Sequence, residues 1–309
     1  MSTPSRRILL VAHPNRPDAH TLAAGVAKRL DAAGVEVVAD PVLAAELDGA
    51  VGVAGEVDPA GGCELVCVLG GDGTILRAAE ISRGCGAPLL GVNLGHVGFL
   101  AEAELETLGE AVDRIVARDY TIEERMTLEV SVIENGREVF TSWALNELSV
   151  EKAIRARMIE LTVEIDGRPL STWGCDGVLV ATPTGSTAYA LSAGGPVIWP
   201  ELEAMLVEPI SAHALFAKPV VVGPHSRVAI EILAGAEVGG VVACDGRRII
   251  EVSPGARIQV RRSPEPVRLA RLDARPFTDR LVAKFDLSIE GWRGRADIER
   301  ARRGDVTGT

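Results

Sequence analysis

The pattern of apolar residues changes at about residue 119, and this change constrains the fold more than any other feature of the sequence. Before it, short continuous apolar runs alternate with segments whose apolar residues recur at helical spacing. Such alternation indicates a parallel sheet covered by helices on both faces. After it, apolar and polar residues alternate with period two, which is typical of antiparallel sheets. We therefore predict a Rossmann-like α/β domain followed by a mainly antiparallel, all-β domain.

The first domain is expected to span residues 1–118. Its apolar runs predict strands over residues 8–12, 35–38, 64–69 and 88–93. Its amphipathic segments predict helices over residues 20–33, 74–83 and 105–118. Ligands of parallel α/β sheets bind at the carboxyl ends of the strands, so any site in this domain is expected there.

The second domain is expected to span residues 119–270. Asparagine or aspartate followed by glycine is a strong hairpin signal, and such pairs end three of the alternating stretches: Asn135-Gly136, Asp166-Gly167 and Asp245-Gly246. The remaining segment, residues 271–309, contains a helical pattern over residues 277–284. We expect this C-terminal segment to pack back on the first domain.

Charge and composition exclude several classes of function. The 309 residues include 32 lysines and arginines against 43 aspartates and glutamates, a net charge of −11. So acidic a chain is a poor candidate for binding nucleic acid or anionic membranes. The five cysteines are scattered, and neither they nor the five histidines have metal-ligand spacing. Without a signal-peptide pattern or a long apolar stretch, the sequence predicts a cytoplasmic protein.

A glycine-rich string, Gly70-Gly71-Asp72-Gly73-Thr74, follows a predicted buried strand and precedes a predicted helix. Glycines at this point let the backbone approach a phosphate, and the N–H groups of the helix start favour an anion. Asp72 would repel phosphate unless it accepts a proton from an attacking hydroxyl or helps to hold Mg²⁺. The alternative is a tight turn in which Asp72 caps the next helix.

A second cluster of small and polar residues lies between residues 176 and 196. Gly185, Gly194 and Gly195 allow close approach of the backbone, and Tyr189 offers a ring and a hydroxyl. Further hydroxyls come from Thr182, Thr184, Ser186 and Thr187. Such a loop can surround a flat polar ligand such as a nucleoside. A structured turn between strands is the alternative.

Four blocks of the sequence, taken in order, resemble a known family. The string Gly70–Thr74 resembles the signature shared by NAD kinases, by diacylglycerol and sphingosine kinases and, in part, by 6-phosphofructokinases. Together with Gly91–Leu100, Ala144–Glu147 and Asp176–Tyr189, it resembles the bacterial, actinobacterial type of NAD kinase. The resemblance covers roughly residues 65–250 and therefore both domains.

The resemblance implies transfer of a phosphoryl group to the 2′-hydroxyl of the adenosine ribose of NAD. The donor would be ATP or polyphosphate, and Asp72 would be the proton acceptor. The implied phosphate-donor loop is Gly70, Gly71, Asp72, Gly73 and Thr74. Mg²⁺ or another divalent cation would be held mainly by the nucleotide phosphates, with Asp72 as a further candidate ligand.

The resemblance also implies a set of NAD-binding residues. They are Asp72, Gly73, Arg77, Asn146, Glu147, Arg157, Asp176, Thr187, Ala188, Tyr189, Ala190, Leu191 and Ser192. Asn146 and Glu147 would hold the ribose hydroxyls, because an amide and a carboxylate suit a vicinal diol. Arg157 would bind an anion. Residues 187–192 would line the adenine pocket.

Other implications concern assembly and specificity. Asp176 would contact the nicotinamide end of NAD or help to close the site of a neighbouring subunit, and the family forms homodimers or homotetramers. His96 stands where arginine is frequent in the family, and Arg247 stands where glutamine is frequent.

Two other functions remain as alternatives. A lipid or sphingoid kinase can use the same Gly70–Thr74 loop, but it needs an apolar or basic membrane face, which this acidic chain does not show. A non-catalytic NAD(P) sensor is the second alternative. Asp72 argues against it, because a sensor without this negative charge would bind phosphate more tightly.

Overall fold

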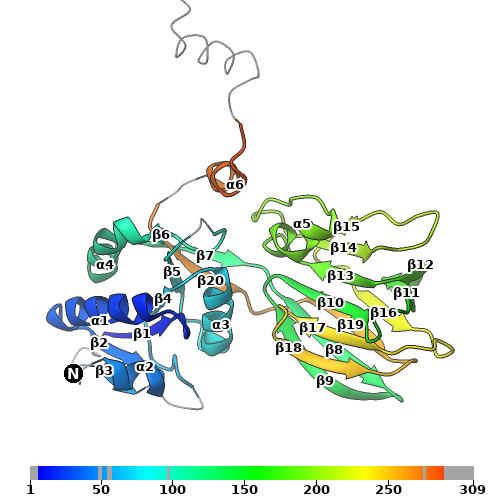
Figure 1. The fold of residues 1–309 in the computed structure, drawn as a ribbon, viewed down its shortest axis with the longest axis horizontal. Helices are drawn as coiled ribbons and strands as arrows, with labels where there is room; N and C mark the ends of the chain where they lie inside the picture. Colours follow the sequence, from blue (N-terminus) through cyan, green and yellow to red (C-terminus); the bar gives the residue numbers. More distant parts are fainter. Residues whose placement is uncertain (1–5, 48–50, 54–57, 96–97, 274–275, 289–309) are drawn as a thin grey trace, which may run out of the picture.

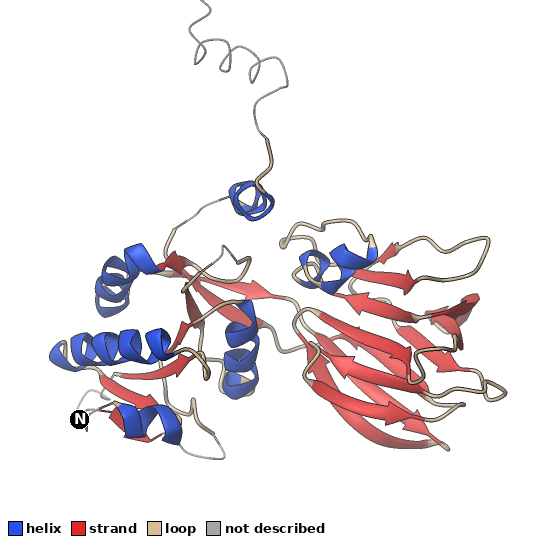
Figure 2. Cartoon of the chain, viewed as in Figure 1, coloured by secondary structure: helices blue, strands red, loops and turns tan. Residues whose placement is uncertain are grey.

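The computed structural model describes residues 6–47, 51–53, 58–95, 98–273 and 276–288. Figure 1 shows two domains side by side, with the helix α6 (Phe277–Phe285) above the gap between their ribbons. Figure 2 shows that most of the helical structure surrounds the sheet of the first domain, whereas the second domain is dominated by strands. The predicted fold class is confirmed. In the described residues, no helix is both long enough and apolar enough to span a bilayer.

The first domain is built on an eight-stranded sheet with the order β3-β2-β1-β4-β5-β20-β7, and β6 pairs with β5. Its strands are β1 (Arg7–Ala12), β2 (Glu36–Ala39), β3 (Val51–Val53), β4 (Leu65–Leu69), β5 (Leu89–Asn93), β6 (Ala103–Glu104), β7 (Thr121–Arg125) and β20 (Val267–Arg271). The pairs are parallel except for β20 with β7. This agrees with the prediction from the continuous apolar runs.

Helices cover both faces of this sheet. They are α1 (Pro17–Ala32), α2 (Pro41–Glu46), α3 (Asp72–Ser82), η1 (Leu105–Thr107) and α4 (Leu108–Ala117). Ile8 and Leu10 of β1 pack in one core with α1 and α4, and Leu9 and Val11 pack in another with α3. Successive side chains of a strand point to opposite faces, so an apolar run of this kind needs cover on both.

Two strands of the first sheet come from sequence assigned to the second domain. β7 begins at Thr121, after the expected boundary at residue 118, and it hydrogen-bonds in the first sheet. β20 lies between β5 and β7, and the expected boundary at residue 270 falls inside it. Its pairing partners are far away in sequence, so local patterning gives no sign of this insertion. The chain therefore crosses between the domains twice.

The second domain consists of two six-stranded sheets with antiparallel pairing throughout. The first contains β15 (Val220–Val222), β14 (Met205–Ile210), β13 (Gly177–Ala181), β10 (Glu147–Lys152), β17 (Gly240–Cys244) and β18 (Arg248–Val252). The second contains β12 (Arg168–Cys175), β11 (Ile159–Ile165), β16 (Val228–Ile232), β19 (Arg257–Arg262), β8 (Leu128–Glu134) and β9 (Arg137–Ala144). One apolar core draws residues from both sheets.

The three predicted hairpin turns are all present in this domain. In each Asx-Gly pair both residues have positive φ, as at Asn135 (51°) with Gly136 (72°) and at Asp245 (52°) with Gly246 (63°). Two positive φ values define the turn whose twist matches antiparallel strands. The small-residue segment after β13 forms the short helices η2 (Gly185–Thr187) and α5 (Tyr189–Ala193).

The C-terminal helix α6 lies against the loop that follows β5. Arg280 donates to the carbonyl of Ala101, and the ring of Phe277 lies 5.8 Å from that of Phe99. Phe277 also makes an edge contact with Trp199 of the second domain. This described part of the C-terminal segment therefore touches both domains.

Candidate active site

The glycine-rich loop lies at the carboxyl end of β4, as predicted, but its aspartate belongs to a helix. Gly71 is the N-cap of α3 and Asp72 is the first helical residue, whereas the sequence pattern predicts a start near Thr74. An acidic residue in the first turn interacts favourably with the helix dipole, which accounts for the earlier start. The first N–H groups of a helix have no partner within it and can bind an anion.

The glycines of this loop have different surroundings. A Cβ on Gly70 would lie 2.4 Å from Oγ1 of Thr74, so this position admits no side chain. A Cβ on Gly71 or Gly73 would meet no atom of the described chain within 4 Å. Gly70 is thus required by packing, and the backbone at Gly71 and Gly73 is open to a ligand.

Two backbone groups orient the carboxylate of Asp72. Oδ2 accepts a hydrogen bond from the N–H of Phe99 at 3.1 Å, and Oδ1 accepts one from the N–H of Leu100 at 3.2 Å. A Cβ on Gly98 would lie 2.4 Å from Oδ1, so this loop approaches closely because it has glycine there. The side chain is half-buried and remains accessible.

A second aspartate shapes the turn that carries Asn146 and Glu147. The carboxylate of Asp245 accepts the N–H of Leu145 at 3.0 Å, of Asn146 at 2.7 Å and of Glu147 at 3.3 Å. Asp245 was expected only as half of a hairpin turn. Its positive φ fulfils that expectation, but the contact of its side chain with a turn about 100 residues earlier has no local sequence signal.

The second glycine cluster packs directly on the same turn. The N–H of Thr182 donates to the carbonyl of Asn146 at 2.9 Å. A Cβ on Gly185 would lie 1.9 Å from that carbonyl oxygen, so only glycine fits. The fold therefore brings together two sequence blocks, at 144–147 and 176–189, that are separate in the chain.

Glu147 is buried beside other carboxylates. Burial, together with the nearby charges of Asp245 and Glu151, raises the pKa of Glu147 to about 8, against an opposing hydrogen bond from the N–H of Tyr189. Its Oε2 finds no hydrogen-bond partner in the described part of the chain. A protonated carboxyl at this place can donate as well as accept, which suits a ligand hydroxyl.

Tyr189 lies among acidic side chains of the second domain. Its hydroxyl donates to Oε2 of Glu151 at 3.2 Å. Burial, with the charges of Glu151, Asp176 and Glu147 contributing, raises the pKa of Tyr189. The structure therefore gathers Glu147, Asp176 and Tyr189 in one neighbourhood, and Asp176 is also ion-paired with Lys152.

An arginine joins the two domains next to this turn. Arg248 pairs with Asp245 at 2.8 Å and with Glu80 of α3, and its guanidinium lies 4.6 Å from the ring centre of Trp143. Arg247 pairs with the same Glu80 at 3.0 Å. The helix that begins at Asp72 is thus tied to the turn that presents Asn146. These contacts join residues far apart in the sequence, and local pattern does not reveal them.

Other predicted site residues lie apart from these contacts or inside the core. Arg77 faces Asp40 at 3.6 Å, and the largely exposed Arg157 pairs with Glu237. Ala190 is completely buried in a small core beneath α5, so its methyl group supports the helix and cannot line a ligand pocket without rearrangement.

The remaining members of that segment are closer to the surface. Thr187 bonds through Oγ1 to the carbonyl of Thr184 at 3.1 Å. Ala188 and Leu191 are half-buried, and Ser192 is exposed. His96 lies outside the described residues.

Family models match both domains of the chain. The ATP-NAD kinase N-terminal domain matches residues 8–120, and the ATP-NAD kinase C-terminal domain matches residues 145–272. The chain belongs to the NAD kinase family. The resemblance inferred from four blocks of sequence is confirmed, and with it a phosphotransferase that acts on an alcohol group and makes NADP from NAD.

Individual NAD kinases support this assignment. The NAD kinase of Leifsonia xyli is 57% identical, and the match covers 94% of this chain and 97% of that one. The NAD kinase of Thermobifida fusca is 55% identical, with 95% of this chain and 93% of the relative covered.

Solved structures of NAD(H) kinases share the fold. An NAD kinase from Archaeoglobus fulgidus in complex with ATP is 26% identical, with a TM-score of 0.70, over 91% of this chain and all of that chain. Yeast NADH kinase complexed with NADH is 22% identical, with a TM-score of 0.85, over 94% of this chain and 90% of that chain. None of these matches supports the alternative functions, a lipid kinase or a non-catalytic sensor.

Proposed function

We propose that Asp72 is the proton acceptor in the transfer of a phosphoryl group, from ATP or polyphosphate, to the 2′-hydroxyl of the adenosine ribose of NAD. One observation carries the proposal. The carboxylate of Asp72 is held by two backbone N–H groups at the start of α3, next to glycines whose backbone is open. A base must be fixed relative to the hydroxyl that it deprotonates.

With ATP as donor, the 2′-oxygen of NAD attacks the γ-phosphorus. The bond between that phosphorus and the β–γ bridging oxygen breaks, ADP leaves, and the proton of the hydroxyl moves to Asp72. Within the loop Gly70–Thr74, the N–H groups of Gly70 and Thr74 already donate to the carbonyls of Val92 and Gly71. The phosphates of the donor would therefore be bound by the N–H groups between them, from Gly71 to Gly73. Positioning of the reactants and neutralisation of charge dominate catalysis of phosphoryl transfer. The loop and the base together therefore supply most of the catalytic effect.

The turn at residues 145–147 is our candidate for the ribose site. Asn146 and Glu147 offer a side-chain amide and a carboxyl group, and Asp245 fixes the backbone of both residues by accepting their N–H groups. Tyr189 and its neighbours from Thr187 to Ser192, apart from the buried Ala190, would bound the adenine. Asp176 would face the nicotinamide end. Arg77 and Arg157 are exposed enough to reach phosphates once their present ion pairs open.

The donor set of the chain fits Mg²⁺ that arrives with the nucleotide. Among the described residues, no three His, Cys, Asp or Glu side chains are grouped to hold a metal. Mg²⁺ commonly binds through one or two carboxylates together with substrate phosphates. We therefore assign the ion mainly to the phosphates, with Asp72 as the carboxylate nearest to them; when bound, it would neutralise their charge.

We also propose a cytoplasmic homo-oligomer, a dimer or tetramer. Support comes from exposed apolar side chains at the end of the second domain. Ile154 and Met158 follow β10, and Leu215 and Phe216 follow β14. Gly174 lies beside Met158 and pairs with His213, which places the two loops near each other. Exposed apolar groups of this kind often mark a surface for association.

One assay tests the reaction. The protein is incubated with NAD, ATP and MgCl₂, and any NADP is detected with an NADP-specific dehydrogenase. Formation of NADP at a rate that depends on both substrates supports the proposal. Measurable binding of NAD without NADP formation would support a sensor instead.

A further inference from the structure

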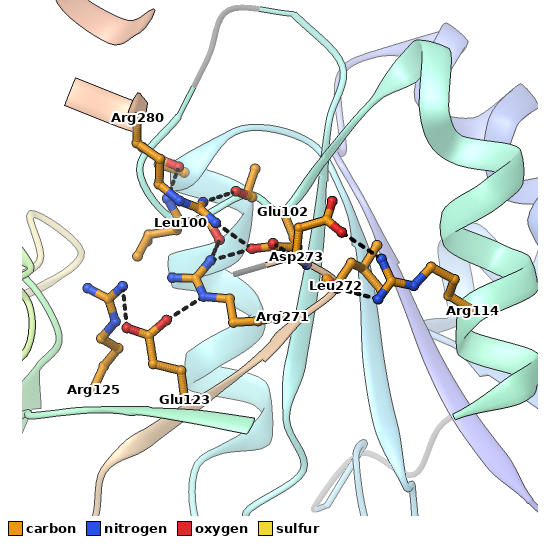
Figure 3. Close-up of polar contacts among 11 residues, drawn as sticks. Leu100, Glu102, Arg114, Glu123, Arg125, Arg271, Leu272, Asp273 and Arg280 are labelled. Atoms are coloured by element: carbon orange, nitrogen blue, oxygen red, sulfur yellow. Dashed lines mark hydrogen bonds and ion pairs between the residues drawn. The ribbon is translucent and has the colours of Figure 1, made fainter. Parts of the chain in front are cut away.

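Five charged side chains form a continuous series of ion pairs beside β7 and β20 of the first sheet (Figure 3). In spatial order they are Arg125, Glu123, Arg271, Glu102 and Arg280, and we call them the charge chain. Positive and negative groups alternate, and each contacts the next. Its members come from β7, from β20, from the residues before β6 and from α6.

The charge chain begins at the cluster of small and polar residues between residues 176 and 196 of the second domain. Arg125 is almost fully buried, and its Nη1 lies 3.4 Å from Oγ1 of Thr184. Its Nη2 pairs with Oε1 of Glu123 at 2.8 Å, and Glu123 pairs in turn with Arg271. Thr184, three residues before the segment proposed to bound the adenine, is therefore linked to β20.

The other end of the charge chain converges on one buried carboxylate. The side chain of Glu102 is 1% exposed, and its Oε2 receives Arg271 at 2.8 Å and Arg280 at 2.7 Å. The N–H of Asp273 donates to Oε1 at 3.2 Å. Glu102 thus fastens both β20 and α6 to the residues that follow β5.

The same two arginines hold the backbone of this loop. Arg271 donates to the carbonyl of Leu100 at 3.3 Å, and Arg280 donates to the carbonyl of Ala101 at 2.6 Å. Leu100 and the preceding residue, Phe99, are the two whose N–H groups bind Asp72. Each arginine therefore lies one or two peptide groups away from the hydrogen bonds that orient this carboxylate.

Helix α6 relies on these contacts for its place. None of its residues is buried, so it has no core of its own to fix it. Arg280 and the rings of Phe277 and Phe285, which lie 5.8 and 5.9 Å from that of Phe99, attach it to the loop. The helix and the loop consequently hold each other in position.

We propose that Arg280 and Arg271 are positioning residues for phosphoryl transfer, because they fix the loop whose N–H groups aim Asp72. Buried ion pairs add little net stability to a protein. A charge chain in such a place is better explained if it holds the loop in a single conformation. The inference rests on the proposed role of Asp72. It adds that the C-terminal helix is part of the catalytic apparatus even though it touches no reacting atom.

The test compares Arg280→Gln with Arg268→Gln in the full-length protein. Arg268 lies on β20, the strand of Arg271, and it pairs with the exposed Glu124 instead of the loop that follows β5. We expect Arg280→Gln to lower kcat about ten- to a hundredfold, because a displacement of about 1 Å can cost about a hundredfold in rate. The KM values for NAD and ATP should stay within about twofold, and Arg268→Gln should match the wild type. Arg280→Lys should recover part of the rate, since one ammonium group can still reach an acceptor.

A double variant separates positioning from direct action. If Arg280 acts through Asp72, Asp72→Asn combined with Arg280→Gln should be no slower than Asp72→Asn alone. A further loss in the double variant, or a wild-type kcat in folded Arg280→Gln, would overturn the inference. A melting temperature near that of the wild type confirms folding, which the exposed position of α6 favours. If Asp72→Asn itself keeps full turnover, the proposed role of Asp72 fails instead.

Discussion

Asp72 and Glu147 are both carboxyl residues of the candidate site, but their surroundings are opposite. Asp72 is half-buried, and each of its oxygens accepts a backbone N–H. Glu147 is buried, one of its oxygens lacks a partner in the described chain, and its pKa is raised to about 8. The contrast teaches that hydrogen-bond donors and solvent access make two carboxyl groups suitable for different roles in the proposed reaction. The oriented Asp72 suits a base, and the desolvated Glu147 suits a neutral partner for a hydroxyl.

The strongest test of this contrast is Asp72→Asn. The amide keeps the size of the side chain but cannot take the proton of the 2′-hydroxyl, so kcat should fall about 10²- to 10⁴-fold. Coupled NADP formation at saturating ATP and NAD measures the effect. The amide nitrogen cannot accept one of the two backbone N–H groups that Asp72 accepts, so the melting temperature should fall by a few degrees while the protein stays folded. Near-normal turnover would show that the two carboxyls do not differ in the way proposed.

Asn146→Ala probes the ribose side of the contrast. Loss of one hydrogen-bonding side chain should raise the KM for NAD about tenfold, in line with about 1–2 kcal/mol for a binding hydrogen bond. The KM for ATP should change less than about twofold. Equal changes for both substrates would contradict a ribose contact.

Glu147→Gln tests the raised pKa of Glu147 through the pH dependence of folding stability. The folded protein keeps the proton of Glu147 up to about pH 8, whereas an unperturbed glutamate releases it near 4.5. Between these values the folded state binds more protons than the unfolded state, so stability falls as pH rises through this window. The variant cannot ionise here, and its melting temperature should decline less than that of the wild type between pH 5 and pH 8.

Glu208 supplies a matched control for this pH effect. It too is a buried glutamate with an unpartnered Oε2 among the described residues, and burial raises its pKa to about 7. Glu208→Gln should therefore also flatten the pH profile of stability, but with a window that ends near pH 7. Glu208 lies on β14, two strands away from β10 in the same sheet, so the KM for NAD should respond more strongly to Glu147→Gln than to Glu208→Gln.

The smallest effect is expected for Arg247→Gln, which removes one of the two arginines that pair with Glu80. Arg247 shares Glu80 with Arg248, and Arg248 alone also holds Asp245. The link between α3 and the Asn146 turn should survive, and kcat and both KM values should stay within about twofold. A larger change in steady-state kinetics would mean that Arg247 does more than support this link.

The sequence predicted those parts of the site that rest on local pattern. A buried strand, a glycine string and an amphipathic helix define the place of Asp72 within about two residues. Asx-Gly pairs define three hairpins, and the change of period separates the two fold types. Each of these signals is made by residues that follow one another in the sequence, so it can be read without knowing the contacts of the folded chain.

The contacts that hold the site together could not be predicted in this way. Asp245 reaches a turn about 100 residues earlier, and Arg271 and Arg280 reach Glu102 across 169 and 178 residues. The block at 91–100 resembles the family, but nothing in its sequence indicates that its N–H groups bind Asp72. Pairing between charged groups at such separations is decided by the assembled fold, and each partner alone looks like an ordinary polar residue.

The insertion of β20 between β5 and β7 also determines when the first sheet can be completed during synthesis. A ribosome completes β5 and β7 long before it reaches Val267, and β7 pairs only with β20 in the described sheet. The nascent first domain therefore exposes an unpaired sheet edge while the whole second domain is being made, and such edges invite aggregation. The part of the chain translated first finishes folding last, so a gene cut between the two domains would not yield an intact first half.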